Sequence, residues 1–257
     1  MSTAPRIIAT RYAEKLATAI ERMSHDGGFS SPEGLSILLD YLLVRLTPGR
    51  TKEEAEALVE KRFCHHSPAG LVALEQVAGI FEEAVKGQPF HDHLGNAYMQ
   101  LASRSGKQAL GQFFTPREVS VMMAELAFND NPNGDPDLPY IRAMEPSCGG
   151  GSMILAAAEV YSRRPGATKP LVWMAIDLDR MCARMAGVQA AAHRIPAVVV
   201  CGDSLRWGCE GYEEAELVWP PIPGRDHVTE GQAAAILDYM GRCEAGEPPL
   251  GESEAAS

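Results

Sequence analysis

The stretch EPSCGGGS at residues 145–152 constrains the fold of this chain more than any other part of its sequence. It follows a short apolar run, YIRAM, and precedes the run MILAAAEVY, whose composition favours a helix. Glycine adopts backbone conformations that other residues avoid, and a loop without side chains lets a ligand approach the backbone closely. The stretch therefore predicts a strand, a glycine loop and a helix in succession. The loop serves either to bind a polar or anionic ligand or only to turn the chain.

Segments typical of strands and of helices alternate after this loop. The alternation predicts an α/β fold, with a parallel sheet whose strands are connected by crossover helices. After the run LVWPPI we expect one helix and no further strand. The expected strands lie at 140–146, 171–179 and 197–203, with a further short strand within 214–223, and the expected helices lie at 152–163, 180–193 and 230–242.

The first part of the chain is predicted to form a helical domain. Apolar residues recur there at helical spacing, and Ser31–Pro32 has the N-cap and first-turn proline that are typical of a helix start. Thr51 and Glu54 have the spacing of a capping box. The expected domains are a helical domain at 1–105, an α/β domain at 106–242 that opens with a helix at 115–128, and a disordered acidic tail at 243–257.

The overall composition favours neither a membrane protein nor a metal site. No apolar run is long enough to cross a membrane. The six cysteines form no CxxC pair, which predicts reduced thiols in a cytoplasmic protein. The CHH run at 64–66 has no second pair of ligands nearby, so we expect no metal there. The net charge of −11 gives no support for DNA binding, because proteins that contact many phosphates usually have a basic face.

Polar residues follow the next two predicted strands. Asp177 lies at the end of one strand and Asp203 at the end of the other. The carboxyl ends of parallel strands meet at the edge of the sheet where ligands bind, and a carboxylate after the second strand suits ribose hydroxyls. The dinucleotide pattern GxGxxG is broken, because Ile154 stands at its third glycine, which argues against NAD or FAD and for another nucleoside ligand. The alternative is that the glycines only form a turn and the aspartates cap helices.

Several segments resemble those of the N6-adenine DNA methyltransferases, particularly the modification subunits of type I restriction systems and their relatives in phages and mobile elements. GQFFTPREV at 111–119 is similar to the segment that lies over the methionine end of S-adenosyl-L-methionine in that family, and EPSCGGGSMI to its cofactor cradle. AIDLD and CGDSL occupy the places of its acidic ribose contact and of the aspartate near the adenine. DHLGNAYMQL at 92–101 is similar to a segment just before the fold.

The resemblance implies a Rossmann-like fold that binds S-adenosyl-L-methionine, DNA as the substrate, and adenine N6 as the methylated atom. It places a phenylalanine pair and the threonine and proline that follow on the methionine part of the cofactor, a cradle at the glycine loop, and one aspartate each on ribose and adenine. For one of the two phenylalanines, packing in the core under the loop is an equal alternative. The implied cofactor residues are Phe113, Phe114, Thr115, Pro116, Glu145, Pro146, Cys148, Gly149, Gly151, Asp177 and Asp203.

The catalytic segment of the family, [DN]-P-P-[YFW], corresponds here to WPPI, residues Trp219, Pro220, Pro221 and Ile222. In the family the target adenine leaves the DNA stack, the aromatic ring stacks on it, and the polar side chain accepts a hydrogen bond from its amino group. Indole has a donor and no strong acceptor, and isoleucine has no flat ring. The segment therefore departs from the chemistry that the family uses.

Three functions remain open from the sequence. The chain is a DNA adenine methyltransferase of unusual form, or a catalytically inactive protein that binds S-adenosyl-L-methionine and acts as a partner or regulator in a DNA modification or restriction system. A methyltransferase for another substrate is the third. We also expect a second copy or another chain to complete the sheet, because the family fold continues with more strands than this sequence predicts.

Overall fold

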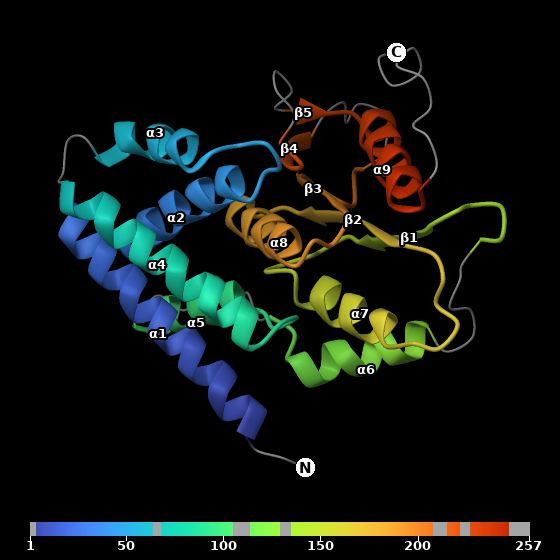
Figure 1. Ribbon diagram of the computed structural model, residues 1–257, viewed down its shortest axis with the longest axis horizontal. Helices are drawn as coiled ribbons and strands as arrows, with labels where there is room; N and C mark the ends of the chain where they lie inside the picture. The colour runs from blue at the N-terminus through green and yellow to red at the C-terminus, as the bar shows by residue number, and fades with distance from the viewer. Residues whose placement is uncertain are drawn as a thin grey trace. The chain divides into compact units, whose positions relative to one another are not determined.

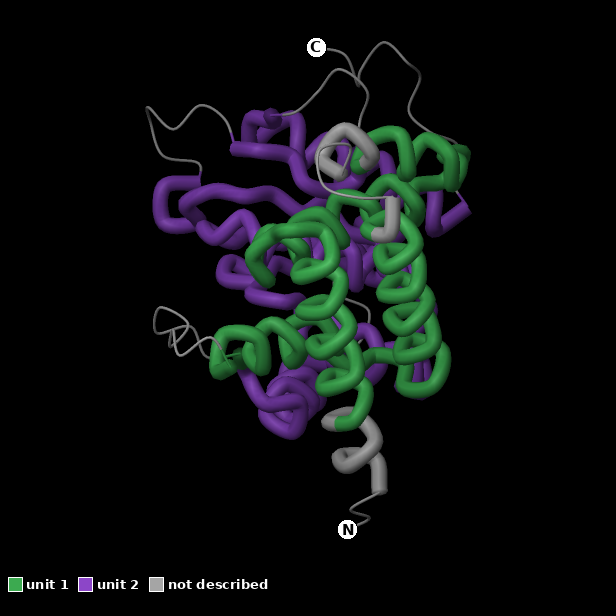
Figure 2. The backbone as a smooth tube through the Cα atoms, turned by 90° about the vertical axis from the view of Figure 1, so that its left-hand side faces the viewer, with its two compact units in different colours: residues 1–114 green, residues 115–257 purple. Residues whose placement is uncertain are grey.

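The computed structural model describes residues 4–63, 68–104, 114–128, 135–207, 215–221 and 227–246, and the side chains of 4–10, 60–63, 68 and 69 are not described (Figure 1). The chain divides into two compact units, residues 1–114 and 115–257, which Figure 2 colours separately. The division lies nine residues after the predicted domain boundary at 105/106, and residues 105–113 lie outside the described part. The cysteine and histidines of the CHH run also lie outside it, as does the tail from 247 onward.

Five helices form the described part of the first unit, where no strand is found. The predicted capping box joins Thr51 and Glu54 by hydrogen bonds in both directions, at 2.8 and 3.2 Å. The cap of the second helix is Ser30, one residue before the predicted Ser31. The side chain of Ser30 accepts from the N–H of Glu33, and the side chain of Glu33 accepts from the N–H of Ser30. The helices are α1 (Ala4–Gly27), α2 (Ser31–Arg45), α3 (Lys52–Phe63), α4 (Pro68–Gly87) and α5 (His93–Arg104).

A five-stranded sheet, in the order β1-β2-β3-β4-β5, forms the centre of the second unit. The first three strands are parallel, as predicted, whereas β4 runs antiparallel to β3 and β5 antiparallel to β4. The expectation of no strand after LVWPPI is wrong, because β5 pairs with the beginning of β4. The strands are β1 (Ile141–Glu145), β2 (Leu171–Asp177), β3 (Ala197–Cys201), β4 (Ala215–Trp219) and β5 (His227–Val228).

Helices cover both faces of this sheet (Figure 1). On one face α8 packs on β2 and β3, and α7 lies beside it and carries α6 on its outer side. On the other face α9 packs on alternate residues of β2 and β3, among them Val172, Ile176 and Val198, which are fully buried. Covering both faces explains why β2 is a continuous apolar run. The helices are α6 (Arg117–Ala127), α7 (Ser152–Ser162), α8 (Arg180–Ala192) and α9 (Glu230–Glu244).

The last helix continues two residues beyond its predicted end at 242. The residues expected to open the disordered tail therefore lie partly in α9, which ends at Glu244. Thr229 caps its start and forms a capping box with Gln232. No helix in the described part of the chain is long and apolar enough to cross a membrane.

Candidate functional site

The carboxyl ends of β1, β2 and β3 meet at one edge of the sheet, because these strands are parallel and aligned in register. Glu145 lies opposite Ala175, and Asp177 lies opposite Cys201. The loops that follow are connected through the end of β2. The carbonyl of Ile176 accepts from the N–H of Cys148, and that of Asp177 accepts from the N–H of Gly202, each at 2.9 Å. The three predicted strand ends are therefore brought together.

The glycine loop is a tight turn that also allows a helix to pack closely. Gly149 and Gly151 have φ angles of 52° and 95°, which favour glycine, and the N–H of Gly151 donates to the carbonyl of Cys148 at 2.8 Å. A Cβ at Gly151 would lie 3.3 Å from the Cα of Ala186 on α8. Gly151 therefore allows α7 and α8 to approach each other. The turn that the sequence offered as an alternative is present, and it lies at the edge that the ligand hypothesis requires.

Asp177 organises this edge through its carboxylate. One oxygen accepts from the N–H of Gly149 at 2.7 Å, and the other accepts from the N–H of Asp179 at 2.9 Å. Asp177 is only partly buried, and a carboxylate has about four acceptor positions, so hydrogen bonds to a ligand are compatible with the two that it already makes. Asp177 therefore connects the glycine loop to the loop after β2.

The other two aspartates stabilise turns. Asp179 is the N-cap of α8 and accepts from the N–H groups of Met181 and Cys182. Asp203 accepts from the N–H of Leu205 at 3.0 Å through its side chain. The alternative of helix caps thus holds for Asp179, whereas Asp203 supports the turn after β3.

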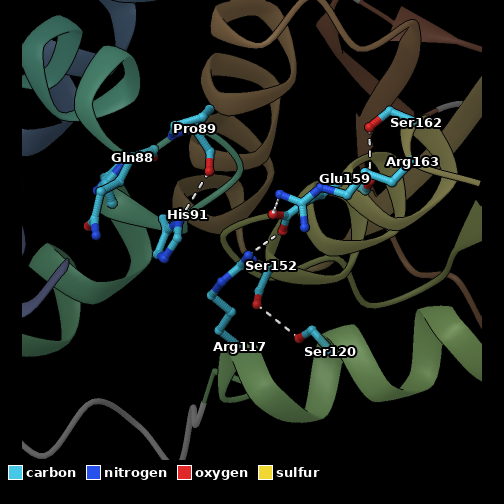
Figure 3. Close-up of polar contacts among 10 residues, drawn as sticks. Gln88, Pro89, His91, Arg117, Ser120, Ser152, Glu159, Ser162 and Arg163 are labelled. Atoms are coloured by element: carbon cyan, nitrogen blue, oxygen red, sulfur yellow. Dashed lines mark hydrogen bonds and ion pairs between the residues drawn. The ribbon is translucent and has the colours of Figure 1, made fainter. Parts of the chain in front are cut away.

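The segment before α6 is attached to the start of α7. The hydroxyl of Ser152 lies 3.0 Å from the hydroxyl of Ser120 (Figure 3). It also donates to the carbonyl of Thr115 at 3.2 Å. Arg117 forms an ion pair with the buried Glu159 of α7. Thr115 is therefore held beside the helix that begins at the glycine loop, and Pro116 follows it as the residue before α6. Phe114 belongs to the first unit, where its ring lies 6.0 Å from that of Tyr98, and Phe113 lies outside the described residues.

The family model for N-6 DNA methylases matches residues 90–216, a range that contains the segment before α6, the glycine loop and the ends of β1, β2 and β3. This segment, 127 of the 257 residues, is similar to the N-6 DNA methylase family. The mostly parallel sheet with helices on both faces is a Rossmann-like arrangement.

Two solved structures are similar to the chain, both at low identity. One is a protein of Listeria monocytogenes described as a class I S-adenosylmethionine-dependent methyltransferase, with 12% identity, a TM-score of 0.47, and 91% of this chain and 70% of that chain covered. The other is the methyltransferase subunit of a type I restriction-modification system from Streptococcus thermophilus, with 16% identity, a TM-score of 0.39, and 84% and 60% covered. This chain thus spans about two thirds of their lengths. No curated protein matches.

The WPPI segment, which the resemblance identifies with the catalytic segment of the family, lies away from this edge. Because β4 is antiparallel to β3, Trp219 pairs with Val199, and Pro220 and Pro221 follow toward the amino ends of the parallel strands. β4 is also three strands away from β1, or about 14 Å. Trp219 itself is only 7% exposed, so its ring offers no face for an extruded base. The structure thus separates this segment from the edge that holds the glycine loop, and Ile222 lies outside the described residues.

The electrostatics of this edge do not favour a nucleophile. Burial raises the pKa of the Glu145 carboxyl, and the charge of Asp177 adds to this, while the N–H of Ser147 acts in the opposite direction. Burial also raises the pKa of the Cys148 thiol well above its usual value. A buried thiol with a raised pKa is a poor nucleophile. The edge is therefore suited to binding rather than to covalent catalysis.

Several residues of this edge were not predicted from the sequence. Leu178 and Leu205 are 76% and 89% exposed, although burying a large apolar side chain would stabilise the folded protein. They follow Asp177 and Asp203 closely and could have been found as apolar residues within the two aspartate segments. Gln189 of α8 is fully buried and donates to the carbonyl of Gly150. Its position in the middle of a predicted helix gave no signal.

Among the described residues, no cluster of three or more histidine, cysteine, aspartate or glutamate side chains could hold a metal ion. The donor set does fit a nucleoside with a charged tail. It combines carboxylate oxygens at two strand ends, exposed apolar side chains beside them, and a glycine loop whose backbone carries no side chains. The N–H of the buried Gly150 has no acceptor in the described part of the chain.

Proposed function

We propose that this protein binds S-adenosyl-L-methionine at the carboxyl edge of β1, β2 and β3. The observation that carries the proposal is that the glycine loop, Asp177 and Asp203 lie at one edge and that Asp177 is hydrogen-bonded to the loop. A glycine loop, a carboxylate and a second polar strand end are the groups that a nucleoside with a charged tail requires. The family match supports the same ligand.

Each group has a defined part in this proposal. The loop from Glu145 and Pro146 through Cys148 to Gly151 cradles the cofactor, while Thr115 and Pro116 lie against its methionine part. Asp177 accepts hydrogen bonds from the ribose hydroxyls, and Asp203 lies near the adenine. When bound, the cofactor supplies an electrophilic methyl group on a sulfonium. What this chain contributes is the orientation of that methyl group.

We further propose that the chain acts on, or in a complex with, DNA in the cytoplasm, as a binding member of a modification system that does not itself transfer the methyl group. The position and burial of Trp219 support this over an active enzyme, because catalysis at adenine N6 needs an acceptor and a flat ring beside the methyl group. An active enzyme remains the second candidate, favoured by the similarity to the family.

We propose that a partner chain pairs with the open edge of β1 in either case. Within the described residues β1 pairs only with β2, so its other side presents unpaired backbone N–H and C=O groups. Met144 of β1 is 52% exposed on the face that α9 covers farther along the sheet. A strand from a second copy or from another protein would satisfy these groups and bury Met144, next to the loop that holds the cofactor.

Two measurements on the same preparation test the proposal. Titration calorimetry measures binding of S-adenosyl-L-methionine, and transfer of labelled methyl groups to unmethylated mixed-sequence DNA measures catalysis. Binding without transfer is the expected result. Transfer to adenine would show that the chain is an enzyme and that its acceptor for the amino group lies outside WPPI or that Trp219 moves. Absence of binding would reduce the glycine loop to a turn.

A further inference from the structure

Gln189 is a fully buried polar residue in the middle of α8. Its side-chain amide donates to the carbonyl of Gly150. One turn earlier on the same helix, Ala186 provides the surface that Gly151 approaches so closely that a Cβ there would be crowded. The same face of α8 therefore supports two consecutive glycines of the loop, one through a hydrogen bond and one through packing.

The backbone N–H groups of this loop are nearly all used inside the protein. Those of Ser147, Cys148, Gly149 and Gly151 donate to Glu145 Oε1, to the carbonyl of Ile176, to Asp177 and to the carbonyl of Cys148, at 3.2, 2.9, 2.7 and 2.8 Å. Gly150 differs from them. Its carbonyl is bound by Gln189, and its N–H has no acceptor among the described residues although the residue is buried. Buried N–H groups are normally paired, so this one is available to a ligand.

We propose that Gln189 is a positioning residue for the cofactor, one that fixes the Gly150 carbonyl and thereby keeps the Gly150 N–H available to the methionine part of S-adenosyl-L-methionine. The inference rests on the proposed function. In this proposal α8 fixes the conformation of the glycine loop, which the glycines alone would not determine. Glycine adopts many backbone conformations, so a loop of three glycines needs an external contact to hold one of them.

The contact is part of a closed set of hydrogen bonds. Asp177 holds the N–H of Gly149 and also that of Asp179, and Asp179 caps the start of α8. Gln189, farther along α8, then returns to the loop at Gly150. Loss of Gln189 therefore removes the contact to Gly150 in the middle of the loop, while the bond from Asp177 to Gly149 at its beginning remains.

The test compares Gln189→Met with Val188→Ala in calorimetric titrations with S-adenosyl-L-methionine and with adenosine. Methionine has nearly the length of glutamine but cannot donate to the carbonyl. Val188 is equally buried on α8 and serves as the control for a general loss of stability. We expect Gln189→Met to lower the affinity for S-adenosyl-L-methionine about tenfold. The affinity for adenosine should change less than about twofold in the same variant, because adenosine lacks the methionine part that the loop holds. Val188→Ala should leave both affinities unchanged.

A second variant, Gln189→Glu, gives a readout that a merely structural role would not produce. A buried carboxyl has a raised pKa, and only its neutral form can donate to the Gly150 carbonyl. Gln189→Glu should therefore bind S-adenosyl-L-methionine more tightly at pH 5 than at pH 8, relative to the wild type at each pH. Equal binding by Gln189→Met and the wild type, equal losses for both ligands, or no pH effect in Gln189→Glu would each overturn the inference. If the wild type binds no S-adenosyl-L-methionine, the proposed function itself fails.

Discussion

Replacing Asp177 by alanine separates its two roles, in the protein and toward the ligand. The variant loses two hydrogen bonds from the carboxylate, to the N–H groups of Gly149 and Asp179. Hydrogen bonds to a charged group contribute about 1.5–3 kcal/mol each, and water replaces part of the loss at a partly exposed site, so the free energy of unfolding should fall by about 2–4 kcal/mol. If Asp177 also binds the ribose, the affinity for S-adenosyl-L-methionine should fall by a further 1–3 kcal/mol, or about 5- to 150-fold.

Urea denaturation measures the first effect, and calorimetric titration at a temperature where both proteins are folded measures the second. Asp179→Ala is the matched control, because it removes one helix cap, typically about 1 kcal/mol of stability, and leaves Asp177 in place. Wild-type stability in Asp177→Ala would refute the organising role. An unchanged affinity together with lowered stability would refute the ribose contact alone.

Three further predictions concern separate parts of the second unit. Gly241→Ala should lower the free energy of unfolding by about 1–3 kcal/mol, because its Cβ would lie 2.5 Å from the ring of Tyr140. Gly231→Ala in the same helix is the control, because a Cβ there meets nothing within 4 Å and should not destabilise the protein. Thermal denaturation of both variants measures the difference. Burial raises the folded-state pKa of Glu145 above 4.5, so the wild type loses stability as this carboxyl ionises with rising pH. Glu145→Gln has no carboxyl to ionise, so it should be more stable than the wild type above pH 4.5 and equally stable below. Denaturation curves measured across this pH range test the prediction. Trp219→Phe should leave the affinity for S-adenosyl-L-methionine unchanged, and a tenfold loss in titration would place Trp219 at the cofactor after all.

Local signals in the sequence predicted most elements of the fold. The capping box at Thr51 and the apolar run of β2 each result from physics within a few residues, and both are present. The direction of β4 could not be predicted in this way. A five-residue strand such as AELVW has the same side-chain pattern whether it runs parallel or antiparallel, and its place depends on pairing with distant residues. The alternation of strands and helices predicted a parallel sheet, and the structure pairs β4 with β3 in the antiparallel direction.

The candidate site was predicted to a similar depth. The glycines and Asp177 could be found because each follows a strand directly in the sequence. Asp177 was expected to face a ligand, and the bonds to Gly149 and Asp179 could not be foreseen, since they depend on how three loops meet at the edge. Gln189 was missed for the same reason: it lies 39 positions from Gly150 in the sequence, and only the packing of α8 on the sheet brings them together.

The separation of WPPI from the glycine loop leaves that edge without the polar acceptor and the flat ring that catalysis at adenine N6 needs. The unpaired side of β1 is adjacent to the glycine loop that follows this strand. A strand from a partner that pairs with β1 would end beside the loop and could bring the missing acceptor and ring. The same contact that satisfies the backbone of β1 would then complete the site, which couples assembly to methyl transfer without any change in the cofactor half.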